Sequence, residues 1–275
     1  MVSLNHRLNI FGHLHLAEIG GSDWTHSGNA GVLDLIAGLR WVRENIGHFG
    51  GDPGNVTIFG ESGGGGKVST LLAMPAARGL FHRAIIQSGA TIRLSTRDRA
   101  TALAEGVLKE LGLGKNECEW LQSVPVERLI AALTPAQQAV GPSPRPMLDR
   151  YVFGPFVDGA DLPVHPFDPA APAVSDDIPL VIGNTKDEAS LFLVGDDKVW
   201  NGTLTEAEVK ARLARVAGAD TDRVLELYRA RDPKANPAEL LIAASTGGHF
   251  WVRSVMLAER KVARNRAPIY FYAFN

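Results

Sequence analysis

The sequence has little cysteine, little excess charge and no long apolar run. Its single cysteine, Cys118, excludes a disulfide within the chain, which favours a reducing compartment. Acidic neighbours in the segment GKNECEW argue against a reactive thiolate at that position. The formal net charge is −2, so there is no general electrostatic reason to bind nucleic acid or an anionic membrane surface. No stretch is long and apolar enough to span a bilayer.

The N-terminal segment MVSLNHRLNIFGHLHL also lacks the charged, apolar and small-residue order of a secretory signal. We therefore expect a cytoplasmic protein. With 275 residues, of which 45% are hydrophobic and 21% charged, the chain is long enough to bury one sizeable core. We expect residues 1–275 to form a single domain. Nothing in the sequence indicates a metal or an organic cofactor, and it leaves the oligomeric state open.

Hydrophobic periodicity predicts an alternation of strands and helices. Strands are predicted at 2–8, 56–59, 83–88, 151–163 (with a turn at Asp158-Gly159), 178–183 and 269–274. Helices are predicted at 29–47, 67–74, 95–133 (broken near 112–116), 205–228 and 238–265 (with a weak point at Gly247-Gly248). This alternation predicts an α/β fold in which helices wrap a mostly parallel sheet.

Gly60, Ser62 and Gly64 form a G-x-S-x-G pattern between the predicted buried strand at 56–59 and a helix. That context is the one a nucleophile elbow requires. A strained turn lifts the serine hydroxyl above the sheet, and glycine on either side removes Cβ atoms that would clash there. The next helix would aim its N-terminus at the serine, so that the Gly63 N–H favours a developing oxyanion. The alternative is a glycine-rich turn that joins the strand to the helix and has no catalytic role.

A phosphate-binding loop is the rival functional reading of the same segment. Gly66-Lys67 resembles the end of G-x-x-x-x-G-K-[ST], but the required first glycine falls on Glu61 and the residue after the lysine is Val68. The pattern therefore fails at two positions. We expect Lys67 to be a solvated helix residue.

Beyond this short motif, the chain resembles the type-B carboxylesterases, the family of para-nitrobenzyl-type esterases, liver carboxylesterases and cholinesterases. The matching stretches are SLNHRL (3–8), SGNAGVLDLIAGLRWVRENIGHFGGDPGNVTIFGESGGG (27–65), GLFHRAIIQSGA (79–90), FVDGADLP (156–163) and IGNTKDEASLF (182–192). The family elbow usually reads GESAG, and Gly63 stands here in place of that alanine. The resemblance implies an α/β-hydrolase fold and hydrolysis of small-molecule carboxylic esters.

The resemblance also implies roles for individual residues. Ser62 matches the nucleophile, and Glu188 matches the acid that orients the catalytic histidine. Glu188 follows a predicted strand at its carboxyl end, where α/β sheets place their sites, although Asp187 beside it is a close competitor. Glu61 resembles a glutamate thought to stabilise imidazolium, and Ser88 a supporting hydrogen-bonding serine. Two alternatives are equally open: that Glu61 is only an exposed elbow residue, and that Ser88 only caps the end of a strand.

Family members are longer than this chain, so the resemblance implies a partial domain. The His-Gly-Gly-Gly-type oxyanion loop would lie before Met1, and the catalytic histidine would lie after Asn275. Of the eight histidines present, only His249 follows Glu188 in the order that the fold requires, and a structural helix histidine is the simpler reading of it. We therefore expect a serine carboxylesterase whose base lies outside these residues. The alternative is a catalytically inactive pseudo-esterase or interaction protein on the same fold.

Overall fold

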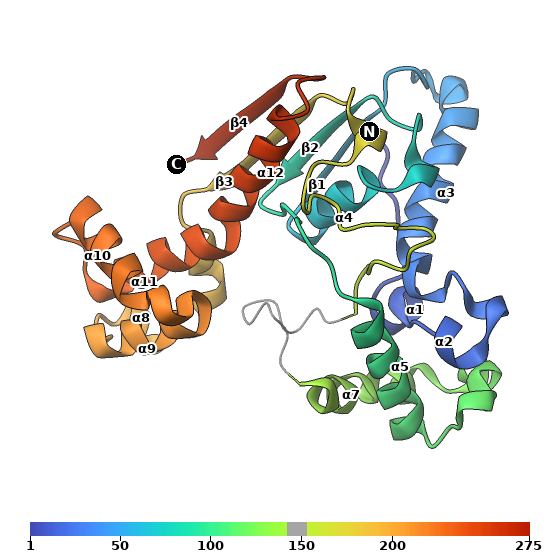
Figure 1. Cartoon of the computed structure of the whole chain (residues 1–275), viewed down its shortest axis with the longest axis horizontal. Coiled ribbons are helices and arrows are strands. Elements are labelled where there is room, and N and C mark those ends of the chain that lie inside the picture. The colour runs from blue at the N-terminus through green and yellow to red at the C-terminus, as the bar shows by residue number, and fades with distance from the viewer. Residues whose placement is uncertain (142–152) are drawn as a thin grey trace.

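A computed structural model describes residues 1–141 and 153–275 of the chain. Its centre is a four-stranded parallel sheet in the order β1-β2-β3-β4 (Figure 1). The strands are Thr57–Glu61 (β1), Arg83–Gln87 (β2), Leu180–Thr185 (β3) and Ile269–Phe274 (β4). Parallel neighbours need long crossover connections, and helices lie within each connection here. The predicted α/β fold is confirmed.

The described helices are Asn9–His13 (α1), Ala17–Gly20 (α2), Ala30–Asn45 (α3), Gly63–Leu71 (α4), Arg97–Leu111 (α5), Val126–Ala131 (α6), Leu133–Val140 (α7), Asp197–Trp200 (α8), Glu206–Ala217 (α9), Thr221–Arg231 (α10), Pro237–Thr246 (α11) and Val252–Val262 (α12). Helices α3, α4 and α12 pack against this sheet, and the other helices lie farther from it (Figure 1). The helix predicted at 29–47 is confirmed as α3. The predicted weak point at Gly247-Gly248 is also confirmed, because a π-helical turn at Gly247–Trp251 separates α11 from α12.

The largest hydrophobic cluster joins the sheet to α3, α4 and α12. Ile36, Val68, Ile86, Ile182 and Leu257 are among its fully buried members. A second cluster is built by α1, α5, α6 and α7, and a third by α8, α9 and α11. Figure 1 shows the second and third clusters as two separate groups of helices below the sheet. The central cluster holds the strands of the sheet against α3, α4 and α12.

Among the described strands, β1 and β4 form the two edges of the sheet. Phe59 in β1 is 55% exposed, and Tyr270, Phe271 and Phe274 in β4 are exposed as well. The predicted strand at 56–59 is confirmed, but its predicted burial is wrong. Burial depends on what packs against a strand, and β1 has a strand neighbour on one side only.

Two predicted strands are wrong. Residues 2–8 form no strand. An alternating segment needs a partner strand, and no described strand pairs with these residues. Instead, Arg7 binds the Asp34 carboxylate of α3 through Nη2 (2.6 Å) and Nε (2.8 Å). The described part of the segment 151–163 forms only a single bridge, Ser95 to Phe156. Residues 151 and 152 lie outside the described ranges. None of the described helices is long and apolar enough to cross a membrane.

Candidate active site

The predicted elbow is present at the junction of β1 and α4. Ser62 stands between Glu61, the last residue of β1, and Gly63, the first residue of α4. Its backbone angles are φ 52° and ψ −115°, a conformation that costs a non-glycine residue about 1–3 kcal/mol. Ser62 is also exposed. The strain therefore presents this hydroxyl to solvent at the end of the strand.

Hydrogen bonds on both sides hold the strained turn. The Ser62 N–H donates to Gln87 O of β2 (2.8 Å), and Ser62 O accepts from the Gly66 N–H (3.0 Å). At Gly60 a Cβ atom would lie 2.3 Å from Gly64 C, so only glycine fits there. A Cβ at Gly64 would meet nothing within 4 Å. The sequence argument for glycine on both sides of Ser62 is thus right for Gly60 and wrong for Gly64.

Gly63 opens α4, and its backbone N–H has no acceptor within the helix, as for every first-turn N–H. Gly63 is exposed, like Ser62. No acidic residue lies in the first turn of α4, so the positive end of the helix dipole is not neutralised from within the helix. The arrangement can therefore stabilise negative charge that develops beside Ser62.

Ser88 is the second strained serine of the site. It follows β2 with φ 54°, and its N–H donates to Gly183 O of β3 (2.9 Å). In the described ranges the only other non-glycine residues with positive φ are Asn9 and Asn265. Two of these four conformations thus fall at adjacent strand ends in the candidate site. A Cβ at Gly89, next to Ser88, would lie 2.1 Å from Ser62 O, so the two turns pack closely.

Glu188 begins a 3₁₀ helix, Glu188–Leu193, just after β3. Its Oε1 accepts a hydrogen bond from the Thr185 N–H (2.7 Å), and the residue is half-buried. Asp187, its competitor, is exposed, and no side-chain hydrogen bond of Asp187 is recorded in the described ranges. The structure therefore orients the Glu188 carboxylate and leaves that of Asp187 in solvent.

The sheet brings the predicted residues to one edge. Ser62, Ser88 and Glu188 follow the carboxyl ends of β1, β2 and β3, which are aligned in register (Glu61 with Gln87, and Gln87 with Gly183). Strand spacing places the ends of β1 and β3 about 10 Å apart. Glu61 is exposed at the end of β1 and makes no ion pair within the described ranges. In those ranges neither Ser62 nor Glu188 is hydrogen-bonded to a histidine.

His249 lies in the π-helical turn and is 7% exposed. Burial, together with the charge of Arg253, lowers the pKa of its imidazole. No hydrogen bond joins it to Ser62 or Glu188 in the part of the chain that is described. The simpler reading, a structural histidine of the helix, fits this position.

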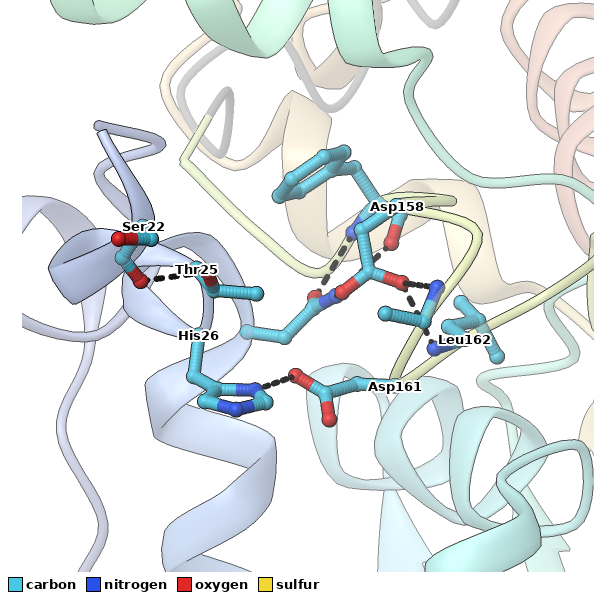
Figure 2. Close-up of polar contacts among 9 residues, drawn as sticks. Ser22, Thr25, His26, Asp158, Asp161 and Leu162 are labelled. Atoms are coloured by element: carbon cyan, nitrogen blue, oxygen red, sulfur yellow. Dashed lines mark hydrogen bonds and ion pairs between the residues drawn. The ribbon is translucent and has the colours of Figure 1, made fainter. Parts of the chain in front are cut away.

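Sequence reasoning missed a buried polar cluster that joins α3 to the segment 156–162 (Figure 2). The Asn29 carboxamide donates to Asp158 Oδ2 (2.8 Å) and Phe156 O (3.1 Å) and accepts from the Phe156 N–H (3.2 Å). Asp158 Oδ1 accepts from the N–H groups of Ala160 and Leu162, both at 2.9 Å. Asn29 therefore ties both backbone groups of Phe156 to the start of α3. The Asp158-Gly159 pair in the sequence predicts the turn, but nothing in the sequence indicates that Asn29 binds it.

His26 lies at the surface of this cluster and contacts Asp161 (Figure 2). Its Nδ1 is 2.8 Å from Asp161 Oδ2, and this contact raises the pKa of the imidazole. The pair ties the loop before α3 to the same segment. No group of three or more His, Cys, Asp or Glu side chains in residues 1–141 and 153–275 is arranged to hold a metal ion.

A parallel sheet with helices around it and a strained serine at a strand–helix junction defines an α/β-hydrolase fold. The carboxylesterase family model matches residues 1–275, and the chain belongs to this family. A para-nitrobenzyl esterase of Bacillus subtilis (strain 168) is 36% identical over 275 residues, which are 100% of this chain and 52% of that protein. Carboxylesterase 1C of Rattus norvegicus is 28% identical over 284 residues, or 49% of its length.

Solved structures agree with this assignment. The crystal structure of the Geobacillus stearothermophilus carboxylesterase EST55 at pH 6.2 matches with a TM-score of 0.82 and 36% identity. The match covers 98% of this chain and 54% of that structure. The chain thus spans about half the length of the relatives it matches, and it corresponds to part of a carboxylesterase.

Proposed function

We propose that this chain carries the nucleophile of a carboxylic-ester hydrolase, with residues 1–275 forming part of one catalytic domain. The observation that carries the proposal is the strained, exposed Ser62 between a parallel strand and a helix N-terminus. Family membership supports it. In this proposal Glu188 orients a histidine base, and that base is supplied from outside these 275 residues.

The chemistry proceeds through an acyl-enzyme. Ser62 Oγ attacks the ester carbonyl carbon while its proton passes to the histidine. The tetrahedral intermediate collapses, the C–O bond to the alcohol breaks, and the histidine returns the proton to the leaving alcohol. Water, deprotonated by the same base, then attacks the acyl carbon and releases the acid and Ser62. No cofactor takes part in this proposed reaction.

Gly63 would supply one oxyanion donor through its backbone N–H. A donor of this kind contributes roughly 10²–10³ in rate. Glu61 and Ser88 would support the charged histidine and the acid from the neighbouring strand ends. The substrate is an ester, and para-nitrobenzyl esters are the first to try because a relative carries that name. We keep a cytoplasmic location as a prediction.

A catalytically inactive interaction protein on the same fold is the second candidate. One observation favours it: in the described ranges neither Ser62 nor Glu188 is hydrogen-bonded to a histidine. Such a protein would keep the elbow as a structural turn. It would leave Ser62 as an ordinary alcohol that does not react.

The deciding experiment is the intact mass, after exposure to a fluorophosphonate, of a folded protein that carries these 275 residues together with the segment that supplies the histidine base. An activated Ser62 gains one probe mass, Ser62→Ala abolishes the gain, and Ser123→Ala, at an exposed serine far along the chain, leaves it unchanged. If Glu188 orients the base, Glu188→Gln slows labelling by about 10⁴. Such a protein with native circular dichroism that stays unlabelled is not a hydrolase and favours the inactive alternative.

A further inference from the structure

Lys67 lies one helical turn after Gly63 and folds back on it. Its Nζ donates to Gly63 O at 3.3 Å, and a Cβ built at Gly63 would be 3.7 Å from the same Nζ. The ammonium is therefore held against the first turn of α4, beside the strained Ser62. The prediction that Lys67 is a solvated residue is wrong, because the residue is half-buried.

This ammonium has no carboxylate partner in the described ranges. Other lysines of the chain do: Lys115 pairs with Glu105 at 2.5 Å, and Lys210 pairs with Asp222 at 2.6 Å. Burial lowers the pKa of Lys67, and no neighbouring acid opposes that effect. Lys67 is thus a partly desolvated cation without a counter-ion at the proposed site.

The nearby charged groups do not supply one. Asp34, whose charge also acts on His13, is already held by three hydrogen bonds from Arg7, from its N–H (2.9 Å), Nε (2.8 Å) and Nη2 (2.6 Å). His13, close enough for the Lys67 charge to act on it, is kept neutral by burial, which lowers its pKa to about 4. Glu61, on the other side of Ser62, makes no ion pair with Lys67. The positive end of the α4 dipole also disfavours a cation in this half of the helix.

We propose that Lys67 selects esters carrying a carboxylate a few atoms from the scissile carbonyl, by pairing with that carboxylate. The inference rests on the proposed hydrolase function of Ser62 and names its substrate class. An anion bound there neutralises the unpaired ammonium and interacts favourably with the start of α4. A neutral ester of the same shape gains neither interaction.

The test separates recognition from chemistry by using the full chain with Ser62→Ala. Two anionic probes place the carboxylate on either side of the ester: para-nitrobenzyl hydrogen succinate, and the butanoate ester of 4-(hydroxymethyl)benzoate. Para-nitrobenzyl butanoate is the neutral probe, with a methyl group in place of the succinate carboxylate. Affinities are measured by titration with chemical-shift detection.

We expect at least one anionic probe to bind roughly 10-fold or more tightly than the neutral probe. Lys67→Met abolishes this preference and Lys67→Arg retains it. Lys109→Met is the matched control, because it removes the same charge from an exposed position on α5 and leaves the preference unchanged. Equal binding of charged and neutral probes overturns the proposal. So does a preference that survives Lys67→Met, or no binding of either anionic probe at millimolar concentration.

Failure of the two proposals gives different results. A charge preference that depends on Lys67, in a folded protein that includes the base and whose Ser62 still resists fluorophosphonate, keeps the recognition role and removes the hydrolase. Labelling of Ser62 without any charge preference keeps the hydrolase and removes the role of Lys67.

Discussion

At the scale of single residues, the candidate site is governed by backbone space. Ser62 and Ser88 both adopt positive φ at strand ends, and the two turns touch through Gly89. Such strained conformations persist only where several surrounding contacts hold the backbone in place. Here the surroundings are the hydrogen bonds of Ser62 to Gln87 and of Ser88 to Gly183. The strain at one serine is therefore supported by the strand that carries the other.

The two glycines flanking Ser62 give opposite predictions. Gly60→Ala places a Cβ 2.3 Å from Gly64 C, so we expect a loss of about 1–3 kcal/mol in the free energy of unfolding. Gly64→Ala adds a Cβ in open space within α4, and we expect a gain of roughly 0.5–1 kcal/mol. Urea denaturation of both variants measures the difference. Equal effects would contradict the packing described around the elbow.

His13 makes a pH-dependent contribution. It is 5% exposed, its Nδ1 contacts Gly28 O at 3.1 Å, and burial lowers its pKa from 6.5 to about 4. Between these two values the unfolded chain binds the proton and the folded chain does not. The folded state is therefore fully favoured above pH 6.5 and loses about 3 kcal/mol as the pH falls to 4.

His13→Gln removes this titration. We expect the stability of the variant to fall less steeply than that of the parent chain between pH 6.5 and 4, as measured by urea denaturation at fixed ionic strength. Asn5→Gln, an exposed change that involves no titrating group, is the control and keeps the parent slope. Parallel curves for the parent and the His13 variant would show that His13 does not titrate differently on folding.

At the scale of elements, the acid-bearing 3₁₀ helix depends on α11. The Thr246 hydroxyl accepts a hydrogen bond from the Ala189 N–H at 3.0 Å, and both residues are buried. This contact fixes the turn next to Glu188. The adjoining Trp251 donates from Nε1 to Thr185 O at 3.2 Å, so the helical connection before β4 holds the end of β3 at two points.

Thr246→Val replaces the acceptor with a methyl group of similar size. It leaves the Ala189 N–H buried and unpaired, and we expect a loss of about 1–3 kcal/mol in the free energy of unfolding. Thr246→Ser retains the hydroxyl and serves as the control. Thermal denaturation of the pair measures the contribution, and identical losses would point to packing rather than to the hydrogen bond.

Elements also differ in how far sequence pattern predicts them. The helix at 30–45 follows from its own periodicity, because one face packs against the core and the other faces solvent. The segment 2–8 has an equally clear alternation, yet it forms no strand. A helix satisfies its backbone hydrogen bonds internally, whereas a strand needs a neighbour. Local pattern is therefore sufficient for the first and insufficient for the second.

At the scale of the whole molecule, two sheet edges that have no further strand partner in the described residues coincide with a small net charge. The charge is −2, so electrostatic repulsion between copies is weak. Phe59 on β1 and the aromatic residues of β4 add apolar surface to those edges. An unpaired strand edge of this kind is a template for association.

Phe59→Lys puts a charge on the β1 edge, and we expect it to slow aggregation several-fold. Light scattering at matched protein concentration measures this. Trp120→Lys makes a similar change at a residue that is 62% exposed on a 3₁₀ helix, away from any strand edge, and controls for the added charge. Equal slowing by both variants would assign the effect to net charge instead of the edge.

The sequence by itself determined the α/β class, the strand–elbow–helix around Ser62 and the position of Glu188 after a strand. These are local features, because each depends on periodicity and on backbone preferences within a few residues. Only the tertiary structure decided which strands form the edges, that Asn29 binds the backbone of Phe156, and that Lys67 lies against Gly63 with no carboxylate partner among the described residues. Those features depend on which distant segments meet, and residue pattern along the chain does not encode that directly.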